Sequence, residues 1–144
     1  MRGSYDVDGI ASEADLDVML RHLGVAVLTS SDIPPPLRDL YAGGRVALRR
    51  GQGREWEKWI KAHVIGHRLL HTGNQLDAPL SWVRYQERQA DEFAGWLIWG
   101  DLRESLDDPP YPITTRLVAS EARVPEGCVE RWWQIVGSGL REAG

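Results

Sequence analysis

The sequence predicts an α+β fold, in which a small sheet packs on helices and a pair of helices follows at the C-terminal end. Two segments in the middle of the chain, at about 55–71 and 82–102, have the apolar spacing of long helices. Shorter, strand-like segments precede them. The 144 residues, of which 42% are hydrophobic, are enough for one domain with its own core and a small appendage.

The first elements are expected to alternate between helix and strand. Glu13–His22 has apolar residues at helical spacing, and Gly24 is suited to end that helix. Residues 25–28 are predicted to form a short buried strand. The prolines at 34–36 indicate an extended loop, and Arg45–Arg49 alternates polar and apolar residues as a half-buried strand does.

The two long helices are expected next. The first, at 55–71, is predicted to end at Gly73-Asn74, which is a typical C-cap signal. The second, at 82–102, carries an apolar stripe that is typical of a helix packed against a core, formed by Phe93, Ala94, Leu97 and Ile98.

A change of composition indicates a boundary near the C-terminal end. Residues 107–110 (Asp-Asp-Pro-Pro) are typical of a linker. We therefore expect a domain of residues 1–106 and a C-terminal helical segment of residues 107–144. Within that segment, residues 114–122 and 125–136 are predicted to form two short helices with the rhythm of a helix-turn-helix.

Composition excludes several classes of protein. No apolar run is long enough to cross a bilayer, and no apolar signal region follows Met1. The one cysteine, Cys128, cannot form an internal disulfide, so a cytoplasmic protein is expected. The net charge of −4 disfavours broad binding to nucleic acid, although a local basic patch stays open.

Two histidines and two carboxylates carry the strongest chemical signal. His63 and His67 are one helical turn apart, so both imidazoles can bind one metal ion. On the second helix, Glu87 can be the third ligand, and Asp91 can accept a hydrogen bond from the other ring nitrogen of a bound histidine. The alternative is an ordinary structural histidine pair beside a solvated acidic face. His71 lies about 12 Å along the axis from His63 and is expected outside the ligand set.

The spacing of these residues resembles that of the ImmA/IrrE-type zinc metallopeptidase family. Proteins of that family have an HExxH helix followed by Leu-Leu-His, and then a helix of the form E-x-x-A-[N/D]-x-F-A. Residues 63–71 and 87–94 correspond to these motifs. The similarity extends over roughly residues 25–102, and includes a strand at Val25 and an edge strand at Val46.

The resemblance implies a zincin-like fold for residues 1–106, in which a small sheet packs on the metal-site helices. It also implies that His63, His67 and Glu87 bind zinc and that Asp91 is hydrogen-bonded to one of these ligands. Members of the family act in bacterial or phage regulation by cutting or binding a partner protein, often a helix-turn-helix repressor. A protein partner is therefore expected here.

One position departs from the family motif. The glutamate that follows the first histidine in the family is Val64 here. That glutamate accepts a proton from zinc-bound water, which valine cannot do, and losing such a base costs about 10²–10⁴-fold in rate. We expect zinc binding with impaired or absent peptidase activity, as in a pseudoenzyme or a weak zinc hydrolase, and assign no catalytic residue.

Two other functions stay open at this point. The chain can be a metal-free protein-interaction module, or a DNA-binding accessory that uses its C-terminal helices. Glu126 and Glu130 occupy positions where a DNA-reading helix needs basic or amide side chains, so a packing role is favoured. Trp132 and Trp133 are adjacent, so one of them is expected to face outward, and Cys128 is expected to pack as a small apolar residue.

Overall fold

The computed structural model describes residues 5–7, 10–71, 79–100 and 114–143. Its fold is α+β, as the sequence predicts. The described elements, in chain order, are β1 (Tyr5–Val7), β2 (Ile10–Ala11), α1 (Glu13–His22), β3 (Ala26–Ser30), β4 (Asp39–Ala42), β5 (Arg45–Arg49), α2 (Arg54–Leu70), α3 (Leu80–Trp99), α5 (Thr115–Ala122) and α6 (Glu126–Ala143). No helix in these ranges is both long and apolar enough to cross a membrane.

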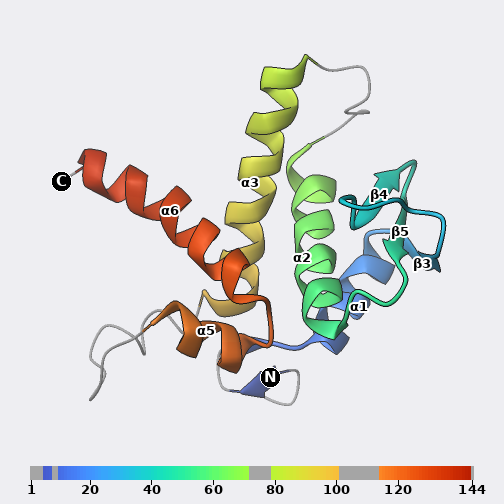
Figure 1. Ribbon diagram of the computed structural model, residues 1–144, viewed down its shortest axis with the longest axis horizontal. Helices are drawn as coiled ribbons and strands as arrows, with labels where there is room; N and C mark the ends of the chain where they lie inside the picture. Colours follow the sequence, from blue (N-terminus) through green and yellow to red (C-terminus); the bar gives the residue numbers. More distant parts are fainter. Residues whose placement is uncertain (1–4, 8–9, 72–78, 101–113, 144) are drawn as a thin grey trace.

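The helices α2 and α3 lie side by side in antiparallel orientation and form the centre of the molecule (Figure 1). The three-stranded sheet lies beside α2, on the side away from α3, and α1 packs against α2. On the other side α6 packs against α3, and α5 packs against α6. The central helix pair therefore contacts the sheet on one flank and the C-terminal helices on the other.

The sheet has the strand order β3-β5-β4, with β5 parallel to β3 and antiparallel to β4. The strand that contains Val46 is thus central, and its expected position at an edge is wrong. The strand β4 was not predicted because it is only four residues long and follows a proline loop. Gly43 and Gly44, both at positive φ, form the turn that pairs it with β5.

The expected strand after Val25 is present, but its predicted burial is wrong. Val25 itself is buried, whereas Val27 and Leu28 in β3 are 39% and 45% exposed. An outer strand packs against a neighbour on one side only, so an apolar run does not ensure burial. In β5 the alternation is as predicted, since Val46 and Leu48 point into the core.

The predicted N-terminal helix and both central helices are confirmed. In α1 the Ser12 side chain accepts a hydrogen bond from the Asp15 backbone N–H, and the Asp15 carboxylate accepts one from Ser12, which forms a capping box. The helix α2 ends at Leu70, and His71 has an extended backbone. The predicted C-cap signal at 73–74 and the last residues of the helix predicted at 82–102 lie outside the described residues.

The C-terminal helical pair is confirmed, but the second helix is longer than predicted. The helix α6 has 18 residues and continues through Gly137, whereas the prediction ended it at residue 136. Its N-terminal half packs on α3 through Trp132, and the described residues show no tertiary contact that explains why the helix continues past Gly137. The expected linker at 107–110 and the boundary between 1–106 and 107–144 lie outside the described residues and stay predictions.

Tryptophans join the C-terminal pair to the central helices. The ring of Trp132 in α6 meets the rings of Trp96 and Trp99 in α3 at centroid distances of 5.1 and 5.3 Å. Trp99 in turn stacks on Trp59 of α2 at 5.8 Å. Trp132 is 4% exposed and Trp133 is 62% exposed, so one of the two faces outward, as expected.

Candidate metal centre

A close helix crossing places the candidate ligands opposite each other. Gly66 lies between His63 and His67 on α2, and Ala90 lies between Glu87 and Asp91 on α3. A Cβ atom on Gly66 would come within 3.2 Å of the Ala90 Cα atom, so the helices touch backbone to backbone at this point. The two small residues therefore bring one turn of each helix within side-chain reach of the other.

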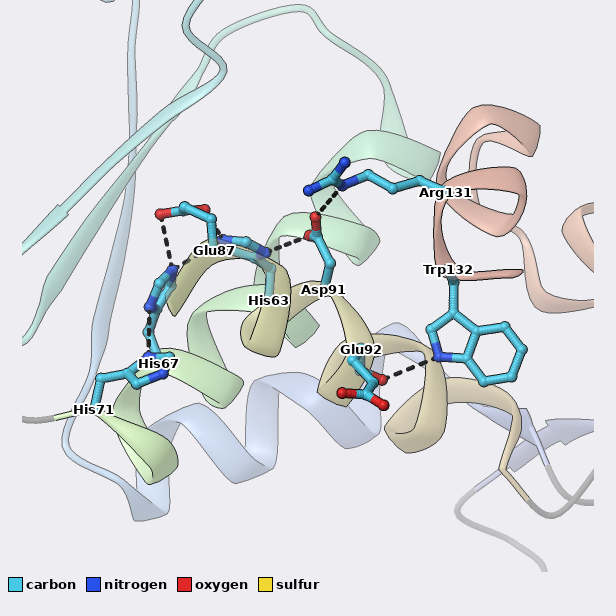
Figure 2. Close-up of polar contacts among 8 residues, drawn as sticks. All are labelled: His63, His67, His71, Glu87, Asp91, Glu92, Arg131 and Trp132. Carbon is cyan, nitrogen blue, oxygen red and sulfur yellow. Dashed lines mark hydrogen bonds and ion pairs between the residues drawn. The ribbon is translucent and has the colours of Figure 1, made fainter. Parts of the chain in front are cut away.

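Three side chains converge in front of this crossing (Figure 2). His63 Nε2 lies 2.7 Å from Glu87 Oε2, and His67 Nε2 lies 3.1 Å from Glu87 Oε1 and 3.0 Å from His63 Nε2. The ligand atoms of these three residues all lie within 4.8 Å of one another. Neighbouring ligands of a tetrahedral zinc ion, at about 2.0–2.1 Å from the metal, are roughly 3.3 Å apart. The group therefore has the composition and the spacing of a metal site.

The second nitrogen of His63 faces Asp91. The Nδ1–Oδ1 distance is 2.7 Å, and Asp91 Oδ2 accepts a hydrogen bond of 2.6 Å from Arg131 Nε on α6. A carboxylate accepts here, so Nδ1 of His63 carries a proton, and Nε2, which faces the convergence point, is the nitrogen that can bind a metal ion. Asp91 thus lies where the sequence placed it, next to a candidate ligand and not among the ligands.

His67 is held by different neighbours. Its Nδ1 lies 3.0 Å from Nδ1 of His71, and its ring stacks against Tyr41 of β4 at a centroid distance of 6.3 Å. His71 is outside the group of three that can hold a metal, as the spacing along the helix predicts. The sheet and the end of α2 therefore both constrain the orientation of the His67 ring.

The carboxylates change the protonation of the cluster strongly. Burial alone would lower the pKa of His63, but the hydrogen bonds and charges of Asp91 and Glu87 outweigh it and raise that pKa to about 10. Burial opposes ionisation of Glu87 and Asp91 too, yet their contacts with His63 hold both pKa values below the usual range. In the absence of a metal ion, a proton on His63 balances the two carboxylates.

The candidate ligands open into a pocket of about 730 Å³ between the helices and the sheet. Its wall includes His63, His67 and Glu87 on one side and Leu28, Leu40 and other mainly apolar residues of the sheet and its loops on the other. Asp39 also lines it, and burial raises the pKa of that carboxyl group; the charge of Glu87 adds to the rise, whereas His63 and His67 oppose it.

Val64 lies in the core rather than on the pocket wall. Its side chain is fully buried among the apolar residues of the main cluster and does not line the pocket. Glu92, which follows Asp91, is directed away from the candidate ligands (Figure 2). Neither residue therefore supplies a proton acceptor beside the three converging side chains.

Sequence reasoning identified the two histidines and the two carboxylates of the central helices, and the structure brings all four together. It missed Asp39, because nothing in the sequence pairs that strand with the helices. It also missed Arg131, whose contact with Asp91 spans 40 positions. The only sequence feature that indicated a further residue near the site was the regular spacing of histidines, which continues from His63 and His67 to His71.

The remaining predicted features of the C-terminal segment can also be located. Cys128 is buried, and burial raises its pKa to about 12, so it is a protonated thiol that packs as an apolar residue, as expected. Glu126 and Glu130 are exposed on α6. If α6 were a DNA-reading helix, basic or amide side chains would be needed at these positions.

Comparisons of this chain with protein families, with curated proteins and with solved structures find no match. The chemical interpretation of the site consequently depends on the geometry of the described residues. The similarity to ImmA/IrrE-type proteins stays a prediction from the sequence motifs.

Proposed function

We propose that this chain is an ImmA/IrrE-like, metallopeptidase-type protein that binds zinc through His63, His67 and Glu87 and uses the adjoining pocket to bind a partner polypeptide. The observation that carries the proposal is the convergence of two imidazole nitrogens and one carboxylate, with contacts of 2.7–3.1 Å, at the mouth of an apolar pocket.

The donor set favours zinc over calcium and magnesium. Calcium and magnesium prefer oxygen ligands, whereas two imidazoles and one carboxylate with a further position open is a frequent set in zinc hydrolases. Zinc in such a site supplies Lewis-acid chemistry and acidifies water. The surrounding residues hold the ligands: Asp91 orients His63, and Tyr41 packs against His67.

The proposed activity is binding rather than efficient peptide cleavage. The position of the family's proton acceptor is occupied by Val64, which is buried in the apolar core. A glutamate-type acceptor at that position is absent, and its loss alone costs about 10²–10⁴-fold in rate. The chain is therefore proposed to be a pseudoenzyme with respect to ordinary peptidases.

Asp39 favours a second candidate, a weak zinc hydrolase. This carboxyl group lines the same pocket as the ligands, and burial raises its pKa, which is the direction that favours a carboxylate as a proton acceptor. If Asp39 has this role, Asp39→Asn removes any slow hydrolysis of a peptide substrate while the zinc content stays unchanged. Loss of zinc in that variant would instead make Asp39 a ligand.

The partner is proposed to be an extended protein segment. Within the described ranges β4 pairs with β5 alone, so its other edge offers backbone donors and acceptors to a peptide. Leu37 and Leu40, which are 47% and 54% exposed, contribute apolar surface to the same pocket. A regulatory role in bacteria or phages, with a helix-turn-helix repressor as partner, follows from the family resemblance alone.

Metal analysis tests the proposal directly. Protein purified without chelators is expected to contain about one zinc ion per chain by mass spectrometry of the metal, and to bind zinc again after its removal. His63→Ala is expected to lose this binding. His22→Ala is the matched control, because His22 is exposed at the end of α1, outside the candidate metal group.

The same preparations separate the alternatives. A metal-free interaction module would bind no zinc in either form, and a DNA-binding accessory would shift a DNA fragment in a salt-dependent way. General protease assays are expected to show little turnover. Rapid peptide hydrolysis by the unmodified chain would contradict the interpretation of Val64.

A further inference from the structure

We propose that His71, Gln89 and Tyr85 form a hydrogen-bond chain that positions His67 and makes Nε2 its metal-binding nitrogen. This inference rests on the proposed function, because it concerns how one ligand of the zinc site is prepared. His71 and Gln89 lie outside the group of three ligands, so the proposal gives them a role as positioning residues.

The direction of each hydrogen bond follows from the chemistry of Gln89. Its amide Nε2 donates to the Tyr85 hydroxyl group at 3.2 Å, so its Oε1 is the atom that faces His71 Nε2, at 2.8 Å. An amide oxygen can only accept, and therefore His71 Nε2 carries the proton. The other nitrogen of the neutral His71 ring, Nδ1, is then an acceptor.

The acceptor on His71 determines the tautomer of His67. The two Nδ1 atoms are 3.0 Å apart, so His67 Nδ1 must be the donor. Neutral His67 then has its lone pair on Nε2, which accepts from the protonated Nε2 of His63 at 3.0 Å and lies beside Glu87 Oε1 at 3.1 Å without a hydrogen bond to it. The chain leaves His67 with an electron pair directed at the point where the ligands converge.

The other histidine is prepared in the same way by Asp91, which accepts from His63 Nδ1. Once the Nε2 proton of His63 has left, both outer nitrogens still donate, and the inner side presents two imidazole lone pairs and a carboxylate to one point. Three electron-pair donors at this spacing repel each other unless a positive charge, either the His63 proton or a metal ion, lies between them. The hydrogen bonds on the outside of the cluster thus favour a cation inside it.

The backbone explains how His71 reaches back to His67. The helix α2 ends at Leu70, and His71 is extended, with φ −126° and ψ 138°. Its backbone N–H still donates to the His67 carbonyl at 2.9 Å, which keeps the two residues close. Gln89 and Tyr85 lie one turn apart on α3, so the chain crosses from one central helix to the other.

Paired substitutions at Gln89 test the proposal, since they change the hydrogen bond while leaving the ligands in place. Gln89→Glu retains an acceptor for His71, and Gln89→Lys replaces it with a donor. With zinc alone as the probe, in competition with a chromophoric chelator, Gln89→Glu is expected to bind as tightly as the unmodified chain. Gln89→Lys and His71→Ala are expected to bind roughly 10- to 100-fold more weakly, as is usual when a ligand loses its outer hydrogen bond.

A second measurement reports the tautomer itself. In ¹⁵N NMR spectra of the metal-free protein, the His67 ring is expected to be protonated at Nδ1 in the unmodified chain and in Gln89→Glu, and to lose that preference in Gln89→Lys. A role of Gln89 in folding alone would not move this signal. Thermal unfolding of each variant identifies any that fails to fold. If His71→Ala unfolds, the comparison between Gln89→Glu and Gln89→Lys still tests the proposal.

Two outcomes overturn the inference in distinguishable ways. If the unmodified chain binds zinc and Gln89→Lys matches it in affinity and in tautomer, the chain has no positioning role while the zinc site stands. If the unmodified chain binds no zinc under any condition, the proposed function fails, and the inference about its ligand fails with it.

Discussion

His63 is the residue on which the charges of the site meet. It contacts Glu87 with one ring nitrogen and Asp91 with the other, both at 2.7 Å. In the metal-free protein a proton on this ring balances the carboxylates, and in the proposed zinc form the ion takes that place. Zinc and protons therefore compete for the same lone pair, and metal affinity falls as the pH is lowered.

The same contacts predict how the stability of the metal-free protein depends on pH. The pKa of His63 rises from 6.5 in the unfolded chain to about 10 in the fold, so its stabilisation is complete below pH 6.5 and is lost as the pH rises toward 10. The melting temperature of the chelator-treated protein is expected to fall over this range more steeply than that of His63→Gln. The control His22→Gln, altered at an exposed site, is expected to follow the unmodified chain.

The acid side has the opposite sign. The pKa values of Glu87 and Asp91 are lowered on folding, so their stabilisation is present above the ordinary values of 4.5 and 3.8 and is lost as the pH falls further. The cluster is accordingly most stabilising between about pH 4.5 and 6.5. Parallel curves for the unmodified chain and His63→Gln above pH 6.5 would contradict this account of the cluster.

At the scale of single residues, the sequence predicts those site residues that lie on one face of the same helix. The spacing of His63 and His67, and of Glu87 and Asp91, follows from helix geometry. Asp39 and Arg131 could not be predicted, because a sheet strand and α6 bring them to the site through tertiary packing. Spacing also does not show that a helix ends at His71 and lets that ring turn back.

Glycines set how closely the helices approach. Gly66 allows α2 to touch the backbone of α3 at Ala90, and Gly95 on the same helix receives the ring of Trp132 from α6. The Trp132 Nε1–H also donates to the Glu92 carbonyl at 3.0 Å, which fixes the ring in place. Arg131, the preceding residue, then reaches Asp91. The docking of α6 and the support of His63 thus depend on one contact.

Gly95→Ala is predicted to weaken this docking. A Cβ atom at position 95 would overlap the buried Trp132 ring, and overpacking of this kind costs about 1–3 kcal/mol. A lower free energy of unfolding in urea is expected. The Trp132 ring is also expected to become more exposed to solvent, which shifts the tryptophan emission to longer wavelength. Gly127→Ala is the matched control, since a Cβ atom there meets nothing within 4 Å. Equal stability of the two variants would show that the ring moves aside at no cost.

The elements themselves were predictable to the extent that local periodicity determines them. The apolar spacing located α1, α2, α3 and the C-terminal pair. It gave no signal for β4, whose pairing depends on the glycine turn, and it ended α6 at residue 136, whereas the helix continues past Gly137. The prediction that β3 is buried was wrong, because a short apolar run does not reveal the order of the strands in the sheet.

In the whole molecule, the candidate site lies where separate parts of the fold meet. The ligands come from α2 and α3, the sheet supplies Tyr41 and Asp39, and α6 supplies Arg131. The α+β class could be predicted because helices and strands differ in period. Their mutual arrangement, which creates the pocket, could not, because it depends on contacts between residues distant in sequence.

Since an ion at this place joins the two central helices, zinc is predicted to stabilise the whole fold. Binding at 100 times the dissociation constant adds about 2.7 kcal/mol to the free energy of unfolding. Added zinc is expected to raise the melting temperature, and a chelator to reverse the rise. Glu87→Gln is expected to lose most of this effect, whereas Glu92→Gln, altered on the same helix but away from the ligands, is expected to keep it.

X-ray diffraction from crystals grown with zinc, recorded on both sides of the zinc absorption edge, tests the metal centre most directly. One strong anomalous peak is expected about 2.0–2.2 Å from Nε2 of His63, Nε2 of His67 and a carboxylate oxygen of Glu87. A map with no peak at this point, or with zinc bound at His71 or elsewhere on the chain instead, would contradict it.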